Sequence, residues 1–303
     1  MGFDYLVSGE CSDIGLHRET NEDAIFNLPS RGVFCVADGM GGVEGGEFAS
    51  QAAVSALREA FSAAGDPGDV SSNRSATLRA INSANLAIKK HAEENGLGGC
   101  GTTVVALVFE HDSPGKAVAY HAGDSRLYCF RSGRLRQITR DHSLAAAAGL
   151  KYDASVPAGF RGLITRAVGL SYQVNLEETF LDVRSGDLFL LCSDGLNRML
   201  TDRRIARCIG RNARKPADAL ARLLVEEANR AGGHDNVSAL LVRVLDLPRG
   251  NAAPGAPGTF LFHFLEFWRR IGARMKRRRL FNVLLFALIL AELFWLARAL
   301  DVF

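Results

Sequence analysis

The sequence repeatedly brings a short apolar run to an aspartate beside a glycine-rich turn. Residues 33–42 read VFCVADGMGG, residues 119–126 read AYHAGDSR and residues 188–195 read LFLLCSDG. Residues 232–237, GGHDNV, lead into an apolar run instead of leaving one. A single aspartate of this kind is ordinarily a turn former that accepts from its own backbone. Several of them at the ends of strands indicate a shared site.

The spacing of the apolar residues predicts an α+β fold. The expected strands are mostly adjacent in sequence and are joined by hairpin-like turns such as residues 131–134, which favours antiparallel pairing over alternating βαβ units. The helical patterns come in pairs, as expected for layers that cover the outer faces of a sheet or sandwich. We expect strands at residues 24–27, 31–37, 102–109, 116–122, 126–131, 187–192 and 236–245, and helices at residues 45–64, 72–94, 201–209 and 216–231.

The end of the chain differs in composition from the rest. Residues 249–259 (RGNAAPGAPGT) are typical of a flexible linker after a domain formed by residues 1–248. An aromatic and basic segment, residues 260–279, precedes the apolar run LFNVLLFALILAELFWLA at residues 280–297, and residues 298–303 are a short tail. Because apolar residues cover every face of that run, we predict a transmembrane helix rather than an amphipathic or buried core helix.

Charge is distributed unevenly along the chain. The net charge of +3 includes seven positive charges in residues 269–279 and one net negative charge in residues 280–303, so residues 1–268 carry −3. A mildly acidic domain is not typical of a nucleic-acid-binding protein, and we expect no nucleic-acid partner. The basic cluster before the apolar run predicts, by the positive-inside rule, a single-pass protein of the inner (cytoplasmic) membrane with its large domain in the cytoplasm.

The aspartates at the strand ends suggest a bound cation. Carboxylates that converge repel one another and raise each other's pKa, so a fold gathers them where a cation lies between them. Hard oxygen ligands of this kind suit Mg²⁺ or Mn²⁺. The glycine after Asp38 lets a backbone carbonyl approach an ion without hindrance. Neither a His/Cys set with zinc spacing nor a G-x-S-x-G nucleophile elbow is present in the sequence.

The cysteines form no CxxC pair and no ligand-like cluster. Three of them, Cys35, Cys129 and Cys192, lie inside apolar strand-like runs. We therefore expect buried free thiols in a reducing compartment rather than disulfides.

Six short motifs follow one another in a fixed order between residues 5 and 245. They are RxxxED (Arg18, Glu22, Asp23), ADGMGG (37–42), GTT (101–103), GDSR (123–126), SDG (193–195) and GGHDNVS (232–238). Together they resemble the metal-dependent protein phosphatase family, type 2C, and in particular its bacterial branch. The resemblance implies a four-layer αββα sandwich, in which helices flank a central antiparallel β-sandwich.

The resemblance also implies a dinuclear centre of Mn²⁺ or Mg²⁺. In this family the two ions share a bridging water that attacks phosphorus directly, with no phosphoenzyme. Asp38 is expected to touch both ions. Glu22 and the carbonyl of Gly39 complete the ligands of one ion. Asp194 and Asp235 are expected to hold the other.

Three further residues take roles from the same resemblance. Asp23 is expected to orient metal-bound water, and Arg18 to reach the substrate phosphate as a forked donor. Asp124, together with Asp194, is expected to bind a third, weaker ion as in bacterial members.

The sequence departs from the family pattern in two places. Met40 stands where many relatives have a histidine proposed as general acid, and a thioether cannot donate a proton. His17 and His121 are candidates for the general acid only because they lie near the motifs in the sequence, and packing or surface roles are expected for both. Residues 144–162 replace the usual charged flap with a short apolar, Gly/Pro-bearing stretch, so substrate preference and metal exchange are expected to differ from the family norm.

The leading interpretation is a membrane-anchored protein serine/threonine phosphatase. We expect such a protein to act on phosphoprotein substrates, to oppose a cognate Ser/Thr kinase and to contact membrane lipid through its C-terminal helix. One alternative is a degenerate phosphatase that recruits phosphoproteins without turnover, but such proteins usually lose metal-binding acids and none is lost here. Another is a membrane scaffold with a soluble head, which leaves the acids unexplained.

Overall fold

Two antiparallel sheets form the centre of the fold. A computed structural model of the chain describes residues 2–62, 72–111, 113–149 and 162–248. The five-stranded sheet has the order β1-β11-β10-β7-β8, and the six-stranded sheet has the order β2-β3-β5-β6-β9, with β4 paired to β3. The strands are β1 (Leu6–Asp13), β2 (Asp23–Leu28), β3 (Val33–Met40), β4 (Gly101–Thr102), β5 (Val104–Phe109), β6 (Lys116–Ala122), β7 (Arg126–Arg131), β8 (Arg134–Gln137), β9 (Glu177–Asp182), β10 (Leu188–Cys192) and β11 (Val237–Val244).

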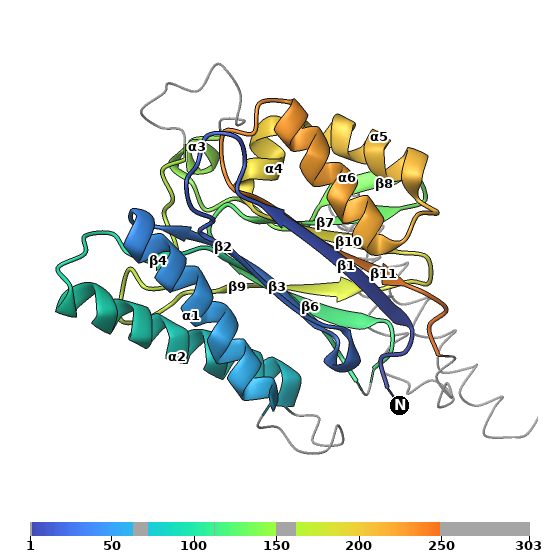
Figure 1. The fold of residues 1–303 in the computed structure, drawn as a ribbon. Helices are drawn as coiled ribbons and strands as arrows, with labels where there is room; N and C mark the ends of the chain where they lie inside the picture. The colour runs from blue at the N-terminus through green and yellow to red at the C-terminus, as the bar shows by residue number, and fades with distance from the viewer. Residues whose placement is uncertain (1, 63–71, 112, 150–161, 249–303) are drawn as a thin grey trace, which may run out of the picture. The chain divides into compact units, whose positions relative to one another are not determined.

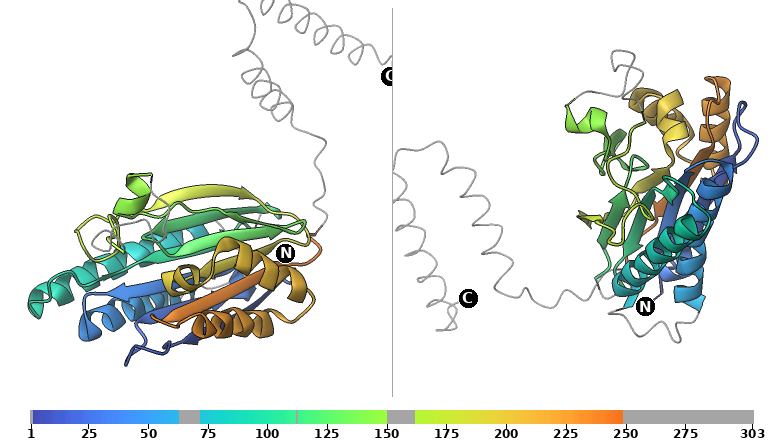
Figure 2. Two further views of the ribbon diagram at one scale, coloured as in Figure 1. Left: turned by 90° about the horizontal axis from the view of Figure 1, so that it is seen from above. Right: turned by 90° about the vertical axis from the view of Figure 1, so that its left-hand side faces the viewer.

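Helices cover the outer face of each sheet, which completes the predicted four layers (Figures 1 and 2). Helices α1 and α2 pack on the six-stranded sheet, and α4, α5 and α6 pack on the five-stranded sheet. The helices are α1 (Val43–Ser62), α2 (Ser72–Glu94), α3 (Leu144–Ala147), α4 (Asp194–Met199), α5 (Asp202–Asn212) and α6 (Ala217–Arg230), with a 3₁₀ turn at Pro29–Arg31.

The layers are held together by three hydrophobic cores. The middle core lies between the sheets, where Phe109 contacts Phe34 and Phe189 edge-on with ring centroids 5.9 and 6.0 Å apart. The two outer cores lie between each sheet and its helices. β3 contributes to two cores, because Phe34 faces the other sheet while Cys35 faces the helices. A strand buried on both faces reads as a continuous apolar run, which is why the sequence shows no alternation there.

The expected elements are confirmed, and three strands and two short helices, α3 and α4, were not predicted. β6 and β7 have the predicted bounds, and the predicted strand at residues 102–109 is divided into β4 and β5. The unpredicted strands β8 and β9 alternate buried or half-buried residues with exposed ones, and β1 mixes the two without strict alternation; all three contain serine, glycine or charged residues. β8 and β9 lie at the edges of their sheets, where half of each strand faces water and the apolar signal is weak.

All six cysteines are free, as predicted, and four are buried. Cys11 and Cys208 are half-buried, so the expectation of burial is wrong for these two. Among the residues that the structure describes, no helix is both long enough and apolar enough to span a membrane. The predicted transmembrane helix at residues 280–297 lies outside the described residues, as do the linker and the basic segment before it.

Candidate metal centre

Antiparallel pairing brings the predicted acids to one end of the two sheets. In the six-stranded sheet Asp23, at the start of β2, pairs directly with Asp38 near the end of β3. In the five-stranded sheet Cys192, the last residue of β10, pairs with both Arg126 and Ala239. The turns that carry Asp124, Asp194 and Asp235 therefore lie at the same end of the strands. We call the six acids gathered here the acid centre: Glu22, Asp23, Asp38, Asp124, Asp194 and Asp235.

Glu22 is held in place by backbone hydrogen bonds, and glycines beside it leave room for its carboxylate. Its N–H donates to Asn236 Oδ1 at 2.8 Å, and its carbonyl accepts from the Gly39 N–H at 3.0 Å. Gly46 on α1 faces the carboxylate so closely that a Cβ there would overlap Glu22 Oε2. Gly39 approaches the same helix closely, because a Cβ on Gly39 would overlap the carbonyl group of Gly46. The glycines around Asp38 thus serve helix–strand contact, in addition to the carbonyl access expected from the sequence.

The GTT motif positions Asp38. The Asp38 N–H donates to Thr103 Oγ1 at 3.2 Å, and the Thr103 N–H donates to the Asp38 carbonyl at 2.8 Å. Thr102 Oγ1 also donates to that carbonyl at 3.0 Å. Thr103 in turn shares a 2.7 Å hydrogen bond with Ser125, next to Asp124. Two turns that lie far apart in the chain are therefore joined behind the carboxylates.

Asn236 was not predicted to have a role. Its side-chain amide donates to the carbonyls of Ile14 and Thr20 at 2.9 Å each, while its Oδ1 accepts from Glu22. The asparagine therefore fixes the loop that leads to Glu22 against the turn that carries Asp235. Its place in the GGHDNVS motif was the available sequence signal.

Ser193 supports Asp23 rather than standing ready as a nucleophile. Its hydroxyl donates to Asp23 Oδ2 at 2.7 Å and accepts from the Ser238 N–H at 2.9 Å. Burial nevertheless raises the pKa of Asp23 to about 6, although the hydroxyls of Ser193 and Ser238 act to lower it. The expectation that no serine nucleophile is required agrees with this arrangement.

The electrostatics of the acid centre indicate that its members share one small volume. Burial raises the pKa of Asp38 well above its ordinary value, and the charges of Asp23, Asp194, Asp124 and Asp235 raise it further. Burial also raises the pKa of Asp194 strongly, against the charge of a nearby arginine. The pKa of Glu22 is raised by burial and, to a smaller extent, by Asp235.

Two oxygens of the acid centre test whether a metal fits. Oδ1 of Asp23 and Oδ1 of Asp124 are both buried, and neither has a hydrogen-bond partner within the described part of the chain. Buried carboxylate oxygens without partners are costly, and either a hard divalent cation or a water bound to one satisfies such oxygens. The residues present therefore fit Mg²⁺ or Mn²⁺.

Arg18 lies beside the acid centre, as predicted. Its Nη2 is 2.8 Å from Asp235 Oδ1 and 3.0 Å from Oδ2, and its side chain is 48% exposed. A half-exposed guanidinium at the rim of a carboxylate cluster retains donors for an incoming anion. The arginine of the GDSR motif, Arg126, is engaged elsewhere, because it forms a two-pronged ion pair with Asp141 at 2.8 and 2.7 Å.

Arg198 enters the acid centre without having been predicted. It lies on α4, one turn after Asp194, and forms an ion pair with that residue. The same guanidinium is 3.6 Å from Asp124 Oδ2 and 3.5 Å from Asp235 Oδ2. The i,i+4 spacing from Asp194 was the one local signal for this residue.

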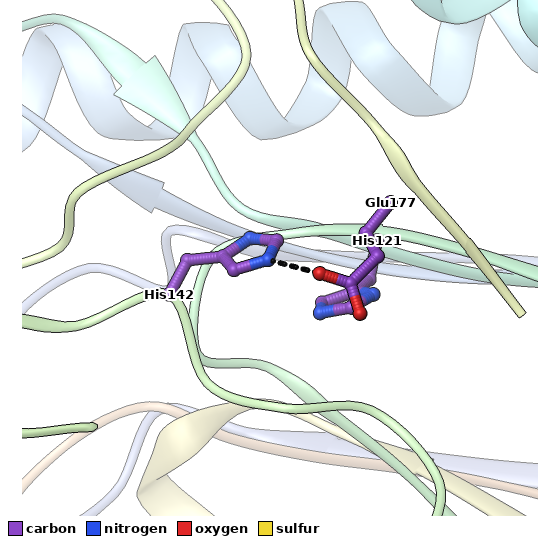
Figure 3. Close-up of side chains that lie close together, drawn as sticks. All are labelled: His121, His142 and Glu177. Carbon is purple, nitrogen blue, oxygen red and sulfur yellow. Dashed lines mark hydrogen bonds and ion pairs between the residues drawn. The ribbon is translucent and has the colours of Figure 1, made fainter. Parts of the chain in front are cut away.

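A histidine pair with a glutamate lies near the Asp124 turn (Figure 3). Potential ligand atoms of His121, His142 and Glu177 lie within 4.8 Å of one another. The His142 Nδ1 accepts from the Gly123 N–H at 3.3 Å, so its proton lies on Nε2, which donates to Glu177 at 3.1 Å. Coordination through Nε2 would require the opposite tautomer, so these contacts favour a support for the turn that precedes Asp124.

His121 and His17 both pack against another histidine. His121 is completely buried, bonds the Arg140 carbonyl through Nε2 at 2.9 Å and stacks on His142, which is the packing role expected for it. His17 stacks on His234. Of the predicted flap, residues 150–161 lie outside the described residues.

Comparison with known proteins agrees with the geometry. Residues 17–245 match the family model "Protein phosphatase 2C". The chain is 36% identical over 248 residues to the serine/threonine protein phosphatase PstP of Mycobacterium tuberculosis, a match that covers 80% of this chain and 46% of that protein. The chain thus spans about half the length of this mycobacterial relative.

Solved structures of similar fold extend the comparison. PppA, described as a key regulatory component of T6SS in Pseudomonas aeruginosa, has a TM-score of 0.71 and 33% identity, covering 81% of this chain and 100% of that one. The catalytic domain of PstP in complex with two manganese ions has a TM-score of 0.67 and 33% identity, covering 80% of this chain and 99% of that one. The family match, residues 17–245, includes all six residues of the acid centre.

Proposed function

This chain belongs to the protein phosphatase 2C family, and from that premise we propose that it is a metal-dependent protein serine/threonine phosphatase. The observation that carries the proposal is the convergence of the six residues of the acid centre at one end of the sandwich. A similar chain that binds two manganese ions supports the choice of Mn²⁺ or Mg²⁺.

The proposed ligands divide between two ions. Glu22, Asp38 and the Gly39 carbonyl would hold one ion, and Asp38, Asp194 and Asp235 would hold the other. When bound, such ions supply an activated water as nucleophile and offset the charge of the phosphoryl oxygens.

The residues of the chain prepare the site for an in-line attack on a phosphomonoester. The backbone of Asp38 is fixed by hydrogen bonds to two threonines, which hold the position from which its carboxylate projects. Asp23 has one buried oxygen without a hydrogen-bond partner among the described residues, and this oxygen can orient a water and accept its proton. Arg18 presents a forked donor at the exposed rim, where it binds and orients the substrate phosphate.

Hydrolysis assays test this proposal directly. The protein is expected to hydrolyse p-nitrophenyl phosphate and a phosphothreonine peptide with Mn²⁺ and to lose that activity with a chelator. Asp38→Ala is expected to lower turnover by at least ~10³-fold. Asp182→Ala is the matched control, because Asp182 is exposed and pairs with Lys116 away from the acid centre. Metal-independent hydrolysis, or near-normal turnover by Asp38→Ala, would defeat the assignment.

We further propose that residues 280–297 anchor the enzyme as a single-pass protein of the cytoplasmic membrane, in contact with lipid. The support is the apolar run itself and the seven basic residues before it. After cell fractionation, the full chain is expected to stay in the membrane pellet through an alkaline carbonate wash, and a chain of residues 1–248 is expected to be released. Release of both chains would refute the anchor.

Phosphoprotein substrates and an opposing Ser/Thr kinase complete the proposal. Phosphoproteomics of cells that lack the protein, compared with cells that carry Asp38→Ala, is expected to reveal the same accumulated phosphosites. Different sites in the two strains would argue that the protein acts on them by binding rather than by hydrolysis.

A further inference from the structure

The guanidinium of Arg198 lies where two acids of the centre face each other. Asp124 and Asp194 both carry side chains that are less than a tenth exposed. Arg198 Nη2 forms an ion pair with Asp194 and lies 3.6 Å from Asp124 Oδ2, so one nitrogen serves both carboxylates. The other terminal nitrogen, Nη1, lies 3.5 Å from Asp235. The side chain itself is 24% exposed.

Two other described arginines lie nearby, and both are paired with other acids. Arg126 is the sequence neighbour of Asp124, but it is committed to the two-pronged pair with Asp141. Arg18 pairs with Asp235 at the rim. Burial raises the pKa of Asp124, and among the surrounding charges Arg198 has the largest effect, which is to lower it. Arg198 is therefore the principal positive charge at Asp124 and Asp194.

Arg198 Nη2 contacts both Asp124 and Asp194, so the guanidinium and a divalent ion cannot both occupy the space between these two carboxylates. Asp194 and Asp235 are contacted by different nitrogens of the guanidinium, which leaves the space between that pair to the second ion. The guanidinium and an ion between Asp124 and Asp194 would compete for the same oxygens, and like charges a few ångströms apart in a buried site repel strongly. The tether to α4 keeps the guanidinium at high local concentration, because Arg198 follows Asp194 by one helical turn.

We propose that the Arg198 guanidinium takes the place of a third divalent ion between Asp124 and Asp194. The centre then binds two ions, and Asp124 serves as a partner of Arg198 instead of a metal ligand. This inference rests on the proposed function, since it concerns the number of ions that the phosphatase site accepts. It replaces the third-ion role that the sequence suggested for Asp124.

Metal stoichiometry tests the inference with a readout other than activity. Equilibrium dialysis of the full chain against Mn²⁺, followed by metal analysis, is expected to give two ions for the wild type. Arg198→Met removes the charge and keeps the length of the side chain, and it is expected to bind a third ion at least ~10-fold more tightly than the wild type. Arg198→Lys keeps the charge and is expected to remain at two ions.

Asp124→Asn gives a second test that does not depend on the folding of the Arg198 variants. Because Asp124 is assigned no ion in the wild type, the variant is expected to retain two. A loss of one ion in Asp124→Asn, a third ion in the wild type, or no third ion in a folded Arg198→Met would overturn the inference. A wild-type protein that binds no Mn²⁺ and hydrolyses nothing would instead refute the proposed function.

Discussion

One methyl group at Gly46 tests the geometry of the acid centre. A Cβ there would overlap Glu22 Oε2, so the carboxylate has to move by about 1.5 Å to regain van der Waals separation. The overlap involves the end of a flexible side chain, which can yield without unfolding the domain. Alanine is favoured over glycine inside a helix by about 1 kcal/mol, which partly offsets the cost of the displacement. We therefore expect Gly46→Ala to leave the thermal stability of the metal-free protein close to that of the wild type.

Metal binding is expected to respond differently. A change that displaces or misorients a ligand lowers metal affinity by about 10–100-fold, which corresponds to about 1.4–2.7 kcal/mol. Titration calorimetry of the metal-free protein with Mn²⁺ measures this loss, and p-nitrophenyl phosphate turnover at a fixed Mn²⁺ concentration should fall with it. The separation of stability from metal affinity is the signature of a displaced ligand.

Gly45→Ala is the matched control. It adds the same methyl group to the same helical turn, but its nearest neighbours are Cys100 Cβ and Sγ at 3.4 and 3.5 Å, which is ordinary contact. It should therefore leave Mn²⁺ affinity unchanged. Wild-type affinity in Gly46→Ala, or an equal loss in both variants, would show that Glu22 does not bind metal in the way inferred here.

Three further outcomes are expected. In the metal-free protein burial raises the pKa of Asp23 to about 6. Its contribution to the free energy of unfolding, about 3 kcal/mol, is therefore complete below pH ~4 and is lost as the pH rises through about 6. Urea denaturation with EDTA should show this decline, and Asp23→Asn should reduce it. Asp141→Ala removes the short two-pronged ion pair of the largely buried Arg126 and leaves it the longer contact, 3.8 Å, with the exposed Asp202; it should lower the free energy of unfolding by about 3 kcal/mol in the same assay. Iodoacetamide at pH 8 should label Cys11 and Cys208 before the four buried thiols, as peptide mass spectrometry can establish; equal labelling of all six in the folded protein would contradict the burial described here.

Local patterns were enough to locate most strands and the acids at their ends. The run before Asp38 is apolar throughout because β3 is buried on both faces, and the glycines after it mark the end of the strand. Such features depend on residues close together in the chain, so they are visible in the sequence. β9 was missed because an edge strand with one exposed face carries little of that signal.

The pairing of strands that lie far apart in the sequence decides which acids come together and which other side chains lie among them. Arg198 could be matched to Asp194 from their spacing, but its approach to Asp124 follows from the pairing of β7 with β10. The space that Gly46 leaves for Glu22 depends on how α1 packs against β3. The sequence by itself determined that carboxylates end several strands of an antiparallel fold. Only the tertiary structure placed an arginine among them, because the register between distant strands sets that distance and no local pattern encodes it.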